Sequence, residues 1–172
     1  QPLTVKLDPR VTIPPISIAQ QFSLSMKCYK SLYQLHDAMV EVKKLREALQ
    51  PLRKQTENSA IAAAASALDK RADQVGGKAV DIDIDSDIMY AAIRGSRPGE
   101  ETMSSVQAGF VYLMVLMQSA DAAPTTQAVS SLAATEQQNA KIMGQWKLLK
   151  EKDVPVLNAL LTRVNMTPIV LK

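Results

Sequence analysis

The sequence predicts an all-α protein: an antiparallel four-helix bundle with a long, kinked last helix, preceded by a short N-terminal extended strand. Residues 125–164 contain only one glycine and one proline, Gly144 and Pro155. Within them a stripe recurs at steps close to three and four, the period of one helix face: Val129, Leu132, Glu136, Met143, Trp146, Leu149, Leu157, Leu160 and Val164. Aromatic residues make up only 4% of the chain, while alanine, leucine, valine and methionine carry its apolar content. That profile favours helices packed on helices.

The first fifteen residues predict an extended segment rather than a helix. Apolar and polar side chains alternate along 1–7, and Asp8–Pro9 ends the alternation. No hairpin partner follows, so two interpretations remain: the last strand of a preceding β-domain, or an arm lying on the bundle. We therefore divide the chain into a strand or linker at 1–15 and a helical bundle domain at 16–172.

A first helix is predicted from Ser17, which has the side chain of an N-cap and a capping-box partner in Gln20. Pro51 is expected to end or kink this helix. Its predicted inner stripe consists of Ile18, Phe22, Met26, Tyr29, Tyr33, Leu35, Met39, Val42, Leu45 and Leu49.

Two shorter helices are predicted next. The alanine-rich stretch 61–68 favours a helix antiparallel to the first, which stops before Gly76–Gly77. After an irregular stretch, a third helix begins at Thr102 or Gly99. Its apolar positions follow a heptad-like seam: Met103, Val106, Phe110, Leu113, Met117 and Ala120.

The fourth helix is predicted to begin at Pro124 and Thr125 and to meet Pro155 in its interior. A break capped by Asp153 would place the proline in a first turn, where it costs little. However, the stripe stays almost in phase across the proline, which favours one continuous helix kinked by more than about 20°.

Four alternating aspartates are the metal candidates: Asp81, Asp83, Asp85 and Asp87. Their spacing resembles the first half of a calcium loop. However, counting from Asp81 or from Asp83 places neither the required glycine nor the bidentate glutamate. We interpret the stretch as a solvated loop or short strand and predict no metal site.

Trp146 is the ligand-binding candidate, because it lies in the lysine-rich window 141–152 and an open indole could stack on a sugar. The alternative is a structural tryptophan in a cation–π pair. His36 and Cys28 are the only histidine and cysteine; eight residues of helix separate them by about 12 Å. That distance excludes a direct catalytic dyad, and two such ligands cannot complete a zinc site. No phosphate-binding loop or nucleophile elbow is present, and no cofactor is predicted.

Charge and hydropathy exclude two classes of partner. The net charge is +3 and no basic block occurs, so nucleic-acid binding is not predicted. No apolar run approaches the roughly 18 residues of a membrane span.

The opening residues Gln1-Pro-Leu-Thr-Val, followed by Asp8-Pro-Arg-Val, resemble the closing strand of a β-sandwich domain in large exported bacterial proteins. Those proteins carry sortilin-like or BNR-repeat β-propellers and are often labelled glycosyl hydrolase-like. Residues 118–125 and 146–158 are similar to their C-terminal helical region.

The resemblance implies a C-terminal helical module of an exported protein, located in the periplasm, at the cell surface or outside the cell. It supplies no catalytic residues, because an active site would belong to the propeller. The expected function is non-catalytic domain packing or protein–protein interaction, with the upstream β-domains or another protein as partner. The alternative is part of a carbohydrate-active enzyme, contributing to a substrate-binding surface through Trp146 and the aspartates.

Overall fold

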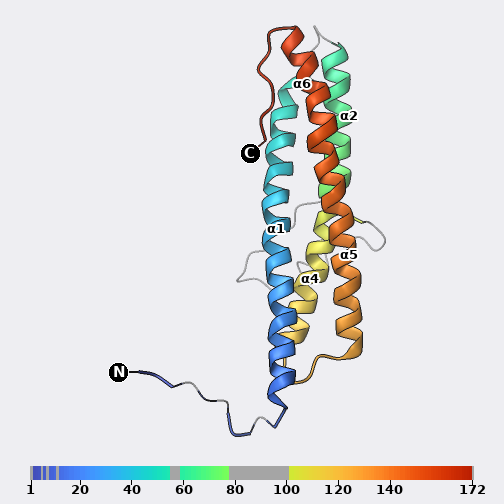
Figure 1. Ribbon diagram of the computed structural model, residues 1–172. Coiled ribbons are helices and arrows are strands. Elements are labelled where there is room, and N and C mark those ends of the chain that lie inside the picture. Colours follow the sequence, from blue (N-terminus) through green and yellow to red (C-terminus); the bar gives the residue numbers. More distant parts are fainter. Residues whose placement is uncertain are drawn as a thin grey trace.

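The computed structural model describes residues 2–4, 6, 8–10, 12–54, 59–77 and 101–171. The described part is helical apart from its lead, connections and tail, so the all-α class is confirmed (Figure 1). The elements are α1 (Pro15–Arg53), α2 (Ser59–Gly76), α4 (Met103–Gln118), α5 (Thr126–Leu148), the π-helical turn η1 (Leu149–Asp153) and α6 (Val154–Arg163).

α1 runs the length of the molecule and organises the other helices (Figure 1). α2 lies along its C-terminal half and α4 along its N-terminal half, while α5, η1 and α6 return along its whole length. The Ser104 hydroxyl donates to the Gly76 carbonyl at 2.9 Å, which joins the start of α4 to the end of α2. This differs from four helices side by side. With 18 and 16 residues, α2 and α4 are each about half as long as the 39-residue α1, and they follow one another along it.

The inner face of α1 follows a heptad pattern. Its buried residues are Ser25, Cys28, Leu35, Ala38, Val42, Leu45, Leu49 and Leu52. The predicted stripe is correct from Leu35 onward but wrong before it, since Phe22, Tyr29 and Tyr33 are exposed by 67%, 45% and 57%. In this half, the small side chains of Ser25 and Cys28 face the core, and the aromatic residues lie on the outside.

The predicted helix starts of the third and fourth helices are confirmed. The Thr102 hydroxyl accepts from the Ser105 N–H in a capping box, and the Thr125 hydroxyl accepts from the Ala128 N–H at 3.1 Å. The start of α1 is not where it was predicted. Pro14 occupies the N-cap position and Ser17 lies inside the first turn, because Pro15 fits the first helical position without losing a hydrogen bond.

Two glycines end α2 and set its distance from α1. A Cβ on Gly76 would lie 2.9 Å from Val42 Cγ1, so only glycine allows the two helices to approach this closely. Gly77 has a φ of +72°, and its N–H donates to the Asp73 carbonyl at 2.8 Å. The second helix therefore ends within the predicted glycine pair, one residue later than expected, because Gly76 is its last residue.

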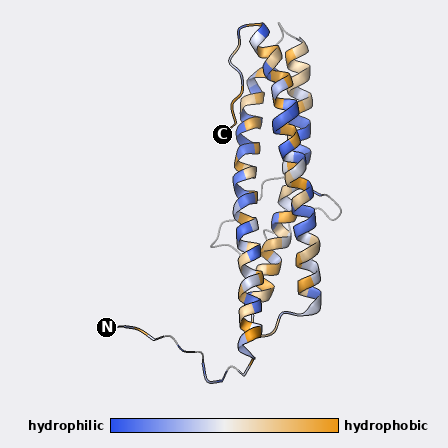
Figure 2. Cartoon of the chain, in the orientation of Figure 1, coloured by the Kyte–Doolittle hydropathy of each residue, from blue (hydrophilic) through white to orange (hydrophobic). Residues whose placement is uncertain are grey.

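α4 buries the predicted seam of Met103, Val106, Phe110, Leu113 and Met117, while Ala120 lies beyond its end. In Figure 2 hydrophobic residues colour most of α4, whereas α1 and α5 alternate along their length. α4 is therefore the most apolar of the described helices.

The last helix continues through Pro155, as predicted, but by way of a π-helical turn. Asp153 has helical angles and makes no capping bond, and the Val154 N–H donates to the Leu149 carbonyl five residues back. The extra residue changes the stripe. Leu149 is followed at the core by Val154, Leu157 and Leu161, a step of five and then three and four. The predicted inner positions Leu160 and Val164 are half-buried and exposed.

The N-terminal strand is not found among the described residues of 2–14. Leu3 is 89% exposed, and Asp8 and Arg10 pair with each other within a turn. The physical reason is that an isolated strand has no ladder partner, and the described residues provide none.

The chain reverses after α6 and its tail packs back on the helices (Figure 1). Asn165 adopts a φ of +57°, and the Met166 N–H donates to the Leu161 carbonyl at 2.9 Å. The Asn158 side chain binds both the N–H and the carbonyl of Ile169, at 2.7 and 2.8 Å. The tail is therefore attached to α6 by these hydrogen bonds.

Candidate functional site

Trp146 is a structural residue and not a stacking platform. Its side chain is 1% exposed, and its indole N–H donates to Glu41 Oε2 at 3.0 Å. Lys150 Nζ lies 2.6 Å from the same oxygen and 5.4 Å from the centre of the indole ring. The cation–π alternative is confirmed, and neither face of the ring is open to a sugar.

Asp69 joins α1 to α2 through two arginines. Its carboxylate, on a residue 7% exposed, accepts from Arg46 Nε at 2.9 Å and from Arg53 Nη1 at 2.5 Å. Arg46 also donates to Asp73 at 2.6 Å. Burial disfavours the Arg46 charge, but the two carboxylates hold the pKa of this guanidinium above its ordinary value. The cluster is an ion-pair lock between the helices.

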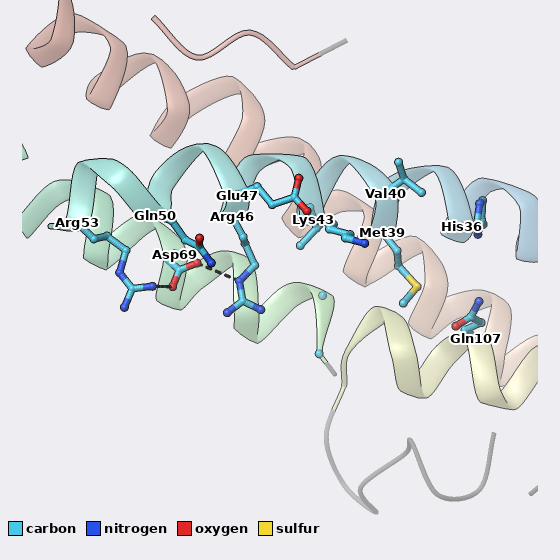
Figure 3. Close-up of a pocket in the computed structure, with 13 residues that line it drawn as sticks. His36, Met39, Val40, Lys43, Arg46, Glu47, Gln50, Arg53, Asp69 and Gln107 are labelled. Atoms are coloured by element: carbon cyan, nitrogen blue, oxygen red, sulfur yellow. Dashed lines mark hydrogen bonds and ion pairs between the residues drawn. The ribbon is translucent and has the colours of Figure 1, made fainter. Parts of the chain in front are cut away.

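A cavity of about 600 Å³ opens beside this lock, where α2 ends and α4 begins along α1. Figure 3 shows that its wall contains Lys43, Glu47, Gln50 and Gln107 as well as the paired arginines. The arginine charges are already neutralised by Asp69 and Asp73, so the cavity does not offer an unpaired arginine cluster to an anion. Its described lining residues include no serine, threonine or cysteine, so they supply no hydroxyl or thiol nucleophile.

His36 and Cys28 remain apart, as predicted. His36 is exposed and lines the cavity, whereas Cys28 is buried in the inner seam of α1. Burial raises the pKa of the Cys28 thiol to about 11. A thiol with this pKa is protonated at neutral pH and inert as a nucleophile.

An exposed row of large apolar side chains follows the outer face of α1. We call it the outer row; Phe22, Tyr29, Tyr33 and Val40 are exposed, and the fifth member, Met26, is half-buried. At 100° per residue these positions fall within about 60° of one another around the helix. The rings of Tyr29 and Tyr33 are 4.7 Å apart, and their hydrogen bond raises the pKa of Tyr29. The row was missed from the sequence because four of its five members, Phe22, Met26, Tyr29 and Tyr33, were assigned to the core.

The four candidate aspartates, Asp81, Asp83, Asp85 and Asp87, lie outside the described residues, so their role remains a prediction. Within 2–54, 59–77 and 101–171, as far as these ranges are described, no group of three or more acidic, histidine or cysteine side chains could hold a metal. None of the helices described combines the length and apolar content needed to cross a membrane.

Comparisons with protein-family models, with curated proteins and with solved structures give no match. Of the surfaces described above, the outer row is the one that exposes large apolar side chains to solvent.

Proposed function

We propose that this chain is a non-catalytic helical module that ends a multi-domain exported β-propeller protein. It packs on the upstream β-domains of that protein or binds a protein partner. The propeller context and the export come from the resemblance of residues 1–11, 118–125 and 146–158 to the C-terminal region of such proteins.

The observation that carries the proposal is the outer row. Phe22 and Tyr33 expose more than half of their surface, whereas the small side chains of Ser25 and Cys28 occupy core positions in the same half of α1. A row of aromatic side chains on an otherwise polar helix face is typical of a protein-binding surface. The buried polar clusters around Asp69 and Glu41 also support a structural role, because their side chains bind to one another and hold the helices together.

The carbohydrate-active alternative is less well supported. It needs an aromatic platform near paired carboxylates, and Trp146 is buried against Glu41 and Lys150. No other observation among the described residues favours it.

The proposal is tested with the parent protein, produced with and without Ser17–Lys172, and with the isolated chain. We expect the isolated chain to turn over no glycoside or peptide substrate. Removing it is expected to weaken the stability or partner binding of the parent and to leave any propeller activity in place. Turnover by the isolated chain would refute the non-catalytic assignment.

A further inference from the structure

The outer row has the pattern of a self-complementary surface. It occupies the face of α1 that points away from the other described helices: Glu41 and Lys27 point to α5 on one side, and Arg46 points to α2 on the other. Two charged residues, Lys30 and Asp37, lie on the same edge of the row, seven residues and therefore two turns apart. Neither has an ion-pair or hydrogen-bond partner among the described residues.

We propose that the outer row binds the outer row of a second copy of this chain, with the two α1 helices antiparallel and a two-fold axis beside Tyr33. This inference rests on the proposed role of the row as a partner-binding face, and it names the partner. A two-fold axis presents the same patch from both copies, so each contact occurs twice.

The positions of the side chains match across this axis. Tyr33 meets Tyr33 of the second copy, and Met26 meets its Val40, because 26 and 40 are equally distant from 33. Lys30 comes within one residue of Asp37 of the second copy, and the reciprocal pair forms on the other side of the axis. Because antiparallel helices related by such an axis bring equal edges together, both pairs lie on one edge of the interface.

The ends of the row also match in chemistry. Lys44 continues the row towards the C-terminus of α1, at 100° per residue, and lies as far from Tyr33 as Phe22 does on the other side. In the dimer, Lys44 of one copy therefore approaches the ring of Phe22 in the other, which allows a cation–π contact.

A parallel pair would lose this complementarity. In a parallel pair the two-fold axis is parallel to the helices, so Lys30 of one copy lies at the same level as Lys30 of the other. The edges that carry Lys30 and Asp37 then lie on opposite sides of the interface. The charge pattern thus selects the antiparallel arrangement. The row has five members, fewer than the roughly 20–30 residues a side of a standard interface, so we expect micromolar affinity.

The first test is the oligomeric state of the 172-residue chain, measured by analytical ultracentrifugation over a range of micromolar concentrations. We expect a reversible monomer–dimer equilibrium. A monomer at every concentration overturns the proposal and leaves the upstream β-domains as the occupant of the row.

The second test exchanges the charges. Lys30→Glu places a second carboxylate against Asp37 of the other copy, and Asp37→Lys places a second ammonium group against Lys30. Either change is therefore expected to weaken the dimer by at least about tenfold. Mixing the two variants restores opposite charges at both contacts and is expected to give a heterodimer. Lys70→Glu on the exposed side of α2 is the matched control and should leave dimerisation unchanged. Equal effects of Lys30→Glu and Lys70→Glu, or no rescue in the mixture, would contradict the geometry.

The third test reads the orientation. Tyr33→Cys is expected to form an intermolecular disulfide, because the two copies of residue 33 meet at the axis. Phe22→Cys is expected not to, since the two copies of residue 22 are roughly 33 Å apart along the antiparallel pair. Cys28 is buried and can stay in both variants. Equal cross-linking of both variants would indicate a parallel pair. Activity of a chain that still dimerises would refute the proposed function alone, and an inactive monomer would refute this inference alone.

Discussion

The two ends of the molecule are held together by different means. Where α4 and the first half of α5 pack on α1, the core contains large apolar side chains such as Phe110 and Met117. Where α2 packs on the other half of α1 and α6 packs on α2, two of the core positions on α2 are alanines, Ala65 and Ala72. We refer to these regions as the apolar end and the polar end.

At the polar end, ion pairs connect helices that pack closely around small residues. Arg46 and Arg53 reach Asp69, Arg71 lies 2.6 Å from Asp153, and Lys150 reaches Glu41. At the apolar end, the Gln21 amide donates to carbonyls at the end of α4, and the ion pair Lys27–Glu136 is long at 3.8 Å. Large apolar side chains such as Leu45, Leu157 and Leu161 are fully buried at the polar end as well. The charged pairs at this end therefore add to an apolar core and do not replace one.

The largest expected effect is at the apolar end. Phe110→Ala should lower the free energy of unfolding by about 3–5 kcal/mol, because it removes a fully buried ring from the middle of the α4 seam. Urea unfolding followed by circular dichroism measures the change. The exposed Tyr112 on the same helix provides the control, and Tyr112→Ala should cost less than about 1 kcal/mol. Equal losses would mean that the comparison of inner and outer faces is wrong.

The next effect concerns the π-helical turn at the polar end. Deleting the exposed Lys152 removes the extra residue of the π turn. Leu149 and Val154 are then separated by four positions and not five, so both still face the core of an ordinary α-helix. Pro155 would then lie in an ordinary α-helix, and the deletion should cost about 3 kcal/mol.

A matched variant separates the two causes. Pro155→Ala alone should change the free energy of unfolding little, and the same deletion in that background should cost less than about 1 kcal/mol, since the ring no longer meets the preceding turn. If the deletion costs the same with alanine at 155, the π turn is required by packing and not by the proline.

Local signals made much of this fold predictable. Thr102 and Thr125 were predicted as helix starts because a capping hydroxyl acts within three residues, and the α4 seam is apolar at every inner position. The continuous last helix followed from the spacing of its stripe. The single-residue shift in that stripe did not, because a π turn inserts one residue without any sequence mark other than the proline.

The functional surfaces were harder to predict. Phe22, Tyr29 and Tyr33 fit a helical period and are more apolar than Ser25 and Cys28, so a hydrophobicity pattern assigns them to the core. Only the position of the partner helices shows that they face outwards. Asp69 meets Arg46 and Arg53 across 23 and 16 residues of chain, and no local pattern indicates such pairing.

Alkaline pH should weaken the apolar end. The pKa of Cys28 is raised from 9.0 to about 11 in the folded chain, so its contribution is complete below pH 9 and is lost as the pH rises towards 11. The loss should reach about 2–3 kcal/mol, at 1.36 kcal/mol per pKa unit. Because tyrosines and lysines titrate in the same range, the measured quantity is the difference in unfolding free energy between wild type and Cys28→Ala. A difference that does not change between pH 8 and pH 11 would contradict the burial of the thiol.

The smallest expected effect compares two aspartates of the ion-pair lock. Asp69→Ala removes a carboxylate with a side chain 10% exposed that two arginines share, whereas Asp73→Ala removes one that is 57% exposed and bonded to Arg46 alone. Breaking a fully buried pair costs about 3–5 kcal/mol. Arg46 and Arg53 are 38% and 44% exposed and regain water when the partner is lost, so we expect about 1–2 kcal/mol for Asp69→Ala. Asp73→Ala should cost less than about 0.5 kcal/mol and lose even that in high salt, because exposed pairs are screened. Thermal unfolding at low and high salt measures both. If the two variants are equally destabilised, the buried position of Asp69 carries no special weight, and the polar end is held by its apolar core and not by its charges.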